Sequence, residues 1–220
     1  MARIGLKGSR RGMFIIQTTV VCVALFGVVS KSCAAEQSQV DQLIRELGTF
    51  PASLQGGFRP DSVEERRRRV YDQLRELDQE AIPALSRGLA KPDVKVRRGV
   101  ALFLAAAGST WYNQGRTRLD IRPCLQPLIA ALQDSDGRVR ELAAQAIENI
   151  GSDAAAAVPA LIKLLEDSNE GSRNCACIGL HGIGPAAKDA LPSLRKALSD
   201  PSPDVRRFAA WAIEKIEGGN

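Results

Sequence analysis

The stretch LQPLIAALQDSDGRVRELAAQAIENIG, residues 125–151, decides the fold of this chain because it recurs twice more at one spacing. Shifted by 33 residues, it aligns without a gap with VPALIKLLEDSNEGSRNCACIGLHGIG, residues 158–184. A second shift of 33 brings LPSLRKALSDPSPDVRRFAAWAIEKIE, residues 191–217, into the same alignment. A fixed period of this length is typical of a repeat protein, in which each repeat is one supersecondary unit.

Each unit contains two apolar stretches at helical spacing. In the 125–151 unit, the first stretch places on one face Leu125, Leu128, Ile129 and Leu132. The second stretch does the same with Val139, Leu142, Ala143, Ala146, Ile147 and Ile150. The turn between them is rich in Asp, Ser, Pro and Gly, which end the first helix and cap the second. The unit is therefore predicted to be a pair of helices joined by a tight turn.

Two further stretches extend the pattern towards the N-terminus. IPALSRGLAKPDVKVRRGVALFLAAAG (82–108) matches it after a ten-residue insertion, and a weaker, split match begins at Val40. Because one helix pair cannot bury its apolar face alone, such pairs stack, and we predict an all-α, right-handed α-solenoid of about five helix pairs. The predicted parts are a divergent repeat over 39–78 with a loop insertion at 49–62, then four repeats over 81–108, 122–152, 154–185 and 187–218, with a loop insertion at 109–118.

Three features of these units resemble HEAT repeats, in particular the short HEAT-like type of the phycobilisome lyases. They are the apolar-Pro-x-Leu start (VPAL, LPSL, IPAL), the turn that contains Asp, and the D-x-x-VR pattern that leads into an Ala-rich helix. The resemblance covers residues 81–218 and, more loosely, 39–78. It implies a HEAT-like superhelix whose first helices line the convex side and whose second helices line the concave, ligand-facing side.

Residues 1–35 have the composition of an export signal. This segment holds five basic residues and no acidic residue, and a mainly apolar stretch runs from Met13 to Val29. Small residues precede candidate cleavage sites after Ala34 and Ala35, so we expect a signal peptide and an exported protein, periplasmic or secreted. The alternative is an uncleaved segment that anchors the protein in a membrane. An arginine pair in SRRGMF also fits a twin-arginine signal, so the choice between Sec and twin-arginine export stays open.

The positive charge of the chain lies in that leader. The sequence has 30 Lys and Arg against 25 Asp and Glu, and five of the basic residues belong to residues 1–35, which leaves 25 of each sign in the rest. A neutral mature chain does not favour nucleic acid as a partner. With one His, no Gly-rich phosphate loop and no evident acid pair, the sequence offers no general base or nucleophile. We therefore predict no enzyme activity, no cofactor and no metal site.

The stretch RNCACIGLHG, residues 173–182, places two cysteines and the single histidine close together. The repeat alignment puts Cys175 in a core column and Cys177 in a column of small residues. Two positions along a helix correspond to about 200°, so these two thiols cannot bind one ion. Cys124 lies in another small column, and a disulfide between Cys124 and Cys177 stays open beside a free thiol.

His181 shares its column with Ala105, Glu148 and Glu214. We interpret this as a solvent-facing column, because two of its members are glutamates. His181 is therefore predicted to be an exposed surface residue rather than a metal ligand.

One column of the repeat is basic, and its members are Arg97, Arg140, Arg173 and Arg206. The HEAT resemblance implies a structural role for it, in which each guanidinium bonds to acids in the turns of its own or a neighbouring unit. These acids are Asp134, Asp167 and Asp200. The alternative is a track that binds phosphate groups.

The two insertions are the candidates for recognition, because insertions in solenoids enter loops and often bind partners. STWYNQGRTR (109–118) combines Trp, Tyr and Arg, the composition of an interaction hot spot. The alternative is that its aromatic residues fill a gap between two units. The predicted partner-binding residues are Trp111, Tyr112, Arg116 and Arg118 in this loop and, on second helices, Gln145, Glu148, Ile178, His181 and Trp211.

These observations predict an exported, non-catalytic scaffold that binds a protein or peptide. Trp211 lies in the last unit, where it either caps the stack or ends an apolar stripe, and self-association through an exposed end face is a further option. The resemblance to lyase-associated repeats gives one alternative, an accessory component of an enzyme system. A structural subunit of an envelope complex is the other.

Overall fold

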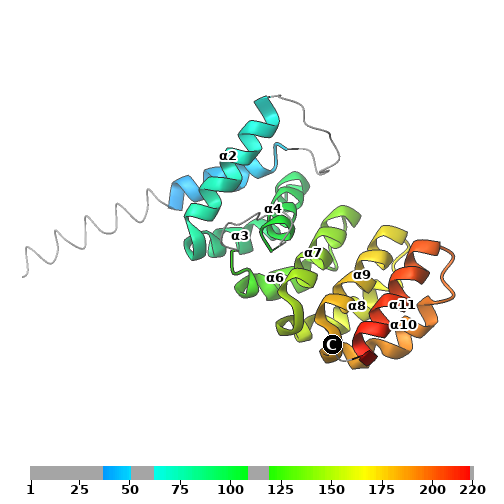
Figure 1. Cartoon of the computed structure of the whole chain (residues 1–220). Helices are drawn as coiled ribbons and strands as arrows, with labels where there is room; N and C mark the ends of the chain where they lie inside the picture. Colours follow the sequence, from blue (N-terminus) through cyan, green and yellow to red (C-terminus); the bar gives the residue numbers. More distant parts are fainter. Residues whose placement is uncertain (1–36, 51–61, 109–118, 219–220) are drawn as a thin grey trace, which may run out of the picture. The chain divides into compact units, whose positions relative to one another are not determined.

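The computed structural model describes residues 37–50, 62–108 and 119–218, and within these ranges it contains helices and turns but no β-strand. A helix over 37–47 comes first. The α-helices that follow are α2 (Ser62–Glu76), α3 (Ile82–Leu89), α4 (Val94–Gly108), α6 (Leu125–Ala131), α7 (Gly137–Ile150), α8 (Val158–Leu164), α9 (Glu170–Ile183), α10 (Leu191–Ala197) and α11 (Pro203–Gly218). The prediction of an all-α solenoid built from helix pairs is confirmed (Figure 1).

Within residues 42–220, the pairs stack through their second helices. The second helices α4, α7, α9 and α11 pack side by side in this order, each on the next (Figure 1). The first helices are shorter: α6, α8 and α10 have seven residues each, whereas α7 and α9 have fourteen. The row of second helices is therefore the continuous packed layer of the stack.

Short 3-10 helices join consecutive units, a feature that the sequence analysis did not predict. They are η1 (Asp78–Ala81), η2 (Arg122–Cys124), η3 (Gly151–Ala157) and η4 (Gly184–Ala190). The second helices α7 and α9 end at Gly151 and Gly184, whose φ angles of 75° and 65° favour glycine. These glycines turn the chain so that η3 and η4 lead back into the next first helix.

Small residues allow the second helices to approach closely. A Cβ atom added to Gly182 on α9 would lie 2.7 Å from the backbone Cα and O of Glu148 on α7. No side chain fits at that distance, so glycine is required where α9 crosses α7. Ala143, Ala144 and Ala176 are fully buried in the same layer. Close contact between small residues thus holds α7 and α9 together.

The three described cysteines belong to this core and are free thiols. Sγ of Cys124 lies 3.6 Å from Oγ of Ser86, and Sγ of Cys177 lies 4.0 Å from the carbonyl oxygen of Val205. The structure therefore does not pair Cys124 with Cys177. Burial raises the pKa of the Cys175 thiol to about 11 and that of Cys177 to about 12, so both are protonated at neutral pH.

One arginine on each of the second helices α4, α7 and α9 binds an aspartate in the turn of the next repeat. Two nitrogens of each guanidinium contact both carboxylate oxygens at 2.7 to 3.0 Å, in the pairs Arg97–Asp134, Arg140–Asp167 and Arg173–Asp200. We call these three pairs the arginine ladder. All six side chains are at most 16% exposed, so solvent screens the pairs only in part.

Both members of a ladder pair also bond to the backbone of the turn in their own repeat. Nη1 of Arg140 donates to the carbonyl oxygen of Asp134 in its own turn, at 2.8 Å, and Arg173 makes the equivalent bond to Asp167 at 2.9 Å. Oδ1 of Asp167 in turn accepts the backbone N–H of Asn169 at 2.8 Å. Each carboxylate is therefore oriented by its own turn before the arginine of the preceding repeat reaches it.

Arg206 occupies the same column on α11 but has a different environment. Its Nη1 donates to the carbonyl oxygens of Asp200 and Pro201 at 2.6 and 2.9 Å, as in the other repeats. Its side chain is exposed, and no carboxylate among residues 37–50, 62–108 and 119–218 forms a salt bridge with it. Arg206 thus keeps the bonds within its own turn and lacks the contact between repeats.

We expect Arg173→Ala to lower the free energy of unfolding by about 1–3 kcal/mol, because it leaves the mostly buried Asp200 carboxylate without its cation. Arg206→Ala is the matched control, since it removes the same bonds to turn carbonyls without breaking a ladder pair. Thermal unfolding followed by circular dichroism measures both variants. Equal losses of stability in the two variants would contradict a structural role for the ladder.

Acid should weaken the ladder. The side chain of Arg173 holds the pKa of Asp200 below its ordinary value. A depressed folded-state pKa adds stability above the unfolded value of about 4, and this stability is lost as the pH falls through the folded value. We therefore expect wild type to be more stable than Asp200→Asn from pH 7 to pH 5 and the gap to close below about pH 4. Urea unfolding across this range tests it; a gap that persists unchanged at pH 2.5 would be the contrary result.

Candidate protein-interaction surface

The second helices carry a surface that is neither core nor fully exposed. Gln145 and Glu148 on α7 and Ile178 and His181 on α9 are all half-buried. We call these four residues the second-helix face. They occupy equivalent columns in adjacent repeats, so the structure brings four of the predicted partner-binding residues together on neighbouring helices. The equivalent positions on α4, Leu102 and Ala105, are buried.

The interpretation of the His181 column as solvent-facing is wrong. Ala105 is buried, Glu148 and His181 are half-buried, and only Glu214 on α11 is exposed. The reason is the close packing of successive second helices, which shields this column wherever a following repeat is present. Burial, with a smaller contribution from the charge of Lys215, lowers the pKa of His181, so the imidazole is neutral at pH 7.

Glu148 is the charged residue of the second-helix face. Burial raises the pKa of its carboxyl group, since partial removal from water disfavours the charged form. The close approach of Gly182 to the backbone of Glu148 leaves little room on that side of the helix. Gln145 is held by a 3.7 Å contact between its Nε2 and the sulfur of Cys175. The face therefore combines an acid, an amide, a neutral imidazole and an aliphatic side chain on two adjacent helices.

Trp211 lies on α11 and is 49% exposed. Its ring meets that of Phe208 edge to face, with ring centroids 5.1 Å apart. The guanidinium of Arg207 stacks over both rings, at 5.1 Å from Phe208 and 5.6 Å from Trp211. An exposed Trp held by Phe and Arg has the composition of an interaction hot spot.

The other predicted partner-binding residues fall outside the described part of the chain. They are Trp111, Tyr112, Arg116 and Arg118. The leader over 1–35 and most of the insertion at 49–62 also lie outside it.

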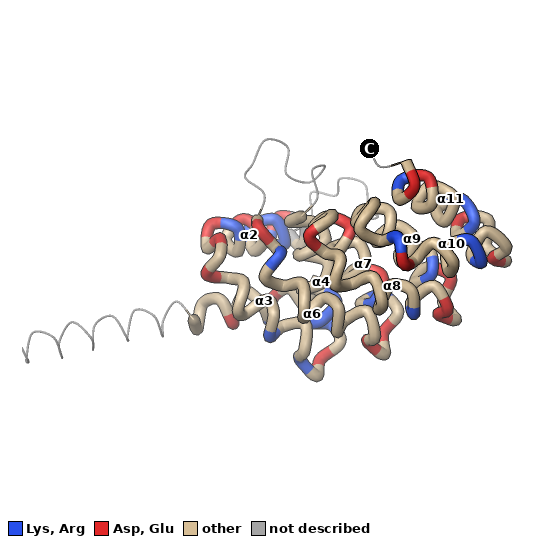
Figure 2. Tube along the Cα trace, turned by 90° about the horizontal axis from the view of Figure 1, so that it is seen from below, with Lys and Arg blue, Asp and Glu red and all other residues tan. Residues whose placement is uncertain are grey.

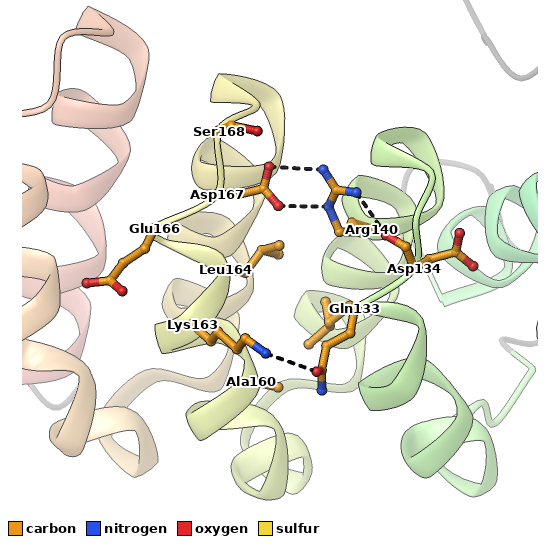
Figure 3. A pocket seen from close by; sticks show the side chains of 10 residues that line it. Gln133, Asp134, Arg140, Ala160, Lys163, Leu164, Glu166, Asp167 and Ser168 are labelled. Atoms are coloured by element: carbon orange, nitrogen blue, oxygen red, sulfur yellow. Dashed lines mark hydrogen bonds and ion pairs between the residues drawn. The ribbon is translucent and has the colours of Figure 1, made fainter.

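Pockets open between consecutive first helices, on a surface that the sequence analysis did not consider. One of about 500 Å³ lies between α6 and α8 and is lined by Gln133, Lys163 and the Arg140–Asp167 pair (Figure 3). Nζ of Lys163 donates to Oε1 of Gln133 at 3.2 Å across its mouth. A second pocket of about 620 Å³ occupies the equivalent place one repeat later, where Lys196 bonds to Glu166. The signal in the sequence was the recurrence of Lys163 and Lys196 at the repeat period.

The described residues offer no evident site for chemistry at a metal ion, because they contain no group of three or more His, Cys, Asp or Glu side chains placed to bind one. Lys and Arg are interspersed with Asp and Glu along the described helices (Figure 2). No helix in this part of the chain has both the length and the apolar character needed to cross a membrane.

Comparison with known proteins agrees with this architecture. Residues 124–154 match the model of the HEAT repeat, and residues 158–220 match a second model of HEAT repeats. A search of curated proteins found no match.

Several solved structures share the fold. An engineered protein is 21% identical, with a TM-score of 0.58, over 84% of this chain and 82% of its own. A computationally designed armadillo repeat protein for modular peptide recognition is 24% identical, with a TM-score of 0.56, over 82% of this chain and 83% of its own. The complex of CpcE and CpcF of phycocyanin lyase from Nostoc sp. PCC7120 contains a chain that is 24% identical, with a TM-score of 0.54, over 77% of this chain and 69% of its own.

Proposed function

Because this chain is a HEAT-repeat protein, we propose that it is an exported scaffold that binds a protein or peptide through its second-helix face and has no catalytic activity of its own. The observation that carries the proposal is the alignment of Gln145, Glu148, Ile178 and His181 on adjacent helices. Recognition surfaces in solenoids arise in this way, since each repeat adds one set of side chains to a continuous face.

The packing of the stack supports this choice of surface. Second helices contact one another directly, whereas pockets open between the first helices α6 and α8 and between α8 and α10. A stack that curves towards its second helices must space them more closely than its first helices. A concave row surrounds an extended ligand on more than one side, which increases the area that the ligand buries.

The side chains of the second-helix face suit a ligand that carries both polar and apolar groups. Ile178 offers an apolar contact, Glu148 an acceptor for a basic or amide group, and Gln145 and His181 hydrogen bonds. Held side chains cost little conformational entropy on binding, and the contact of Gln145 with the sulfur of Cys175 limits the motion of its amide group. An extended peptide with a basic side chain next to an aliphatic one fits this set.

Two other functions remain as candidates. An accessory role in an enzyme system is one, and it rests on the fold shared with the phycocyanin lyase complex. A structural subunit of an envelope complex is the other, and it shares the exported location expected from residues 1–35.

Capture of partners by the tagged full-length protein from the envelope of expressing cells tests the proposal. We expect the double variant Glu148→Gln/Ile178→Ala to retain at least about tenfold less of the partner than wild type, a loss of about 1.4 kcal/mol. The partner is identified by mass spectrometry. The intact mass of the recovered protein shows whether residues 1–35 have been removed.

The matched control is Lys163→Ala/Glu166→Ala, which changes the pockets between first helices and leaves the second-helix face intact. It should bind the partner as wild type does. Loss of the partner in this control, with full retention in Glu148→Gln/Ile178→Ala, would place recognition on the first helices and refute the proposal. Catalytic turnover by the purified protein alone would refute the non-catalytic role.

A further inference from the structure

Helix α9, which lies between α7 and α11, differs from both of these neighbours in its core (Figure 1). Ser172 occupies the column of Val139 on α7 and Val205 on α11, and all three side chains are fully buried. The Oγ atom of Ser172 has no hydrogen-bond partner among the residues that the structure describes. A buried hydroxyl without a partner lowers stability, whereas valine at this position adds apolar burial. The core of the stack is therefore weaker at α9 than at α7 or α11.

A second buried polar atom of α9 lies two residues further along the helix. It is Oδ1 of Asn174, which likewise has no hydrogen-bond partner in the described part of the chain. The equivalent residue on α4 is Arg98, whose guanidinium forms two hydrogen bonds with Asp136 at the start of α7. Helix α4 is thus joined to the next repeat by this pair and by its ladder pair, whereas α9, which contains one arginine, has its ladder pair only.

Glycine residues weaken α9 as a helix. Gly179 and Gly182 lie in its interior, whereas the single glycines of α7 and α11 are the first and the last residue of those helices. Glycine is a poor helix former, because its backbone loses more freedom on folding than that of any other residue. Packing requires both glycines: a Cβ atom added to Gly179 would lie 3.1 Å from Cδ2 of Leu161, and one on Gly182 would meet the backbone of Glu148. The close approach of α9 to α7 therefore lowers the helical stability of α9 itself.

The two thiols of α9 face both of its neighbours. Sγ of Cys175 lies 3.7 Å from Nε2 of Gln145 on α7, and Sγ of Cys177 lies 4.0 Å from the carbonyl oxygen of Val205 on α11. Burial raises the pKa of both thiols, so neither is a nucleophile at neutral pH until it leaves the core. Reaction of these thiols therefore reports that α9 has separated from the helices on either side.

We propose that α9 opens locally in the folded protein, ahead of the unfolding of the whole stack, and that each opening exposes Cys175 and Cys177 while Cys124 stays buried. The stability of a repeat protein is a sum of terms within repeats and between neighbours, so the repeat with the weakest terms opens first. The unpartnered polar atoms, the interior glycines and the single arginine pair all weaken these terms at α9. Because α9 carries Ile178 and His181, the second-helix face is complete only while α9 is closed.

Labelling of the native full-length protein with N-ethylmaleimide tests whether the opening is local. Peptide mapping by mass spectrometry gives the rate for each cysteine, and the rates in urea-unfolded protein correct for differences in intrinsic reactivity. At reagent concentrations where the rate rises linearly, labelling follows the population of the open state. We expect Cys175 and Cys177 to react at least about tenfold faster than Cys124, which is as fully buried as Cys177. A rate for Cys177 that stays within about tenfold of that for Cys124 would overturn the proposal.

A variant distant from α9 separates local opening from global unfolding. Arg97→Ala removes the ladder pair with Asp134, which joins α4 to the repeat of α6 and α7. We expect it to speed the labelling of Cys124 by at least about fivefold and to leave the rates of Cys175 and Cys177 unchanged to within about twofold. If α9 opened only when the whole stack unfolds, all three rates would rise by the same factor, and the proposal would be refuted.

Ser172→Ala tests the cause of the opening, because it removes the buried hydroxyl without adding volume. We expect it to slow the labelling of Cys175 and Cys177 by at least about fivefold. Ser168→Ala is the matched control, since it makes the same change at an exposed position in the preceding turn, and it should leave both rates unchanged. Rates in Ser172→Ala equal to those of wild type would also overturn the proposal. No ligand enters these measurements, so failure of this inference and failure of the proposed function are distinguishable.

Discussion

The stack depends on one interaction, the bidentate pair between an arginine on a second helix and an aspartate in the turn of the next repeat. It joins two segments that are separated by 27 residues in Arg140–Asp167 and in Arg173–Asp200 and by 37 in Arg97–Asp134. Each pair is mostly shielded from water, so its geometry is more restrictive than that of a surface salt bridge. The pair sets the position of each turn against its neighbour, and the second helices that leave these turns are thereby aligned.

The position of the second-helix face follows from this constraint. Aligned second helices bring residues of successive repeats together, such as Glu148 with Gly182 and Gln145 with Cys175. The glycine at position 182 allows the approach that half-buries the His181 column. The links between the later first helices are single bonds of lysine, Lys163 to Gln133 and Lys196 to Glu166, and pockets remain beside them. The residues of the second-helix face therefore lie on one side of the stack, while the pockets between first helices lie on the other.

Much of the fold could be predicted from the sequence because the period repeats both the apolar pattern and the turn residues. The helix pairs and their all-α class follow from the columns of Leu128, Leu161 and Leu194, which are all fully buried. The 3-10 segments η3 and η4 were not predicted, because DAAAA and PAAKDA carry no periodic apolar face.

The partial burial of His181 could not be predicted, because it depends on how closely the next repeat approaches rather than on the polarity of its own helix. The residue types in the His181 column show only that it accepts polar side chains. The residue that indicates the close approach of α9 to α7 is Gly182. Arg206 illustrates the same point in reverse, since its sequence context matches that of Arg173 while its surroundings do not. In a repeat protein, position within the array changes the role of a residue that the repeat itself keeps constant.

A double-mutant cycle on Arg140 and Asp167 tests the central claim most directly. The free energies of unfolding of wild type, Arg140→Ala, Asp167→Ala and the double variant are compared by urea unfolding at pH 7. The account predicts a coupling energy of about 1–2 kcal/mol, because each side chain stabilises the stack mainly through the other. Effects of the two substitutions that add to within about 0.3 kcal/mol would contradict it.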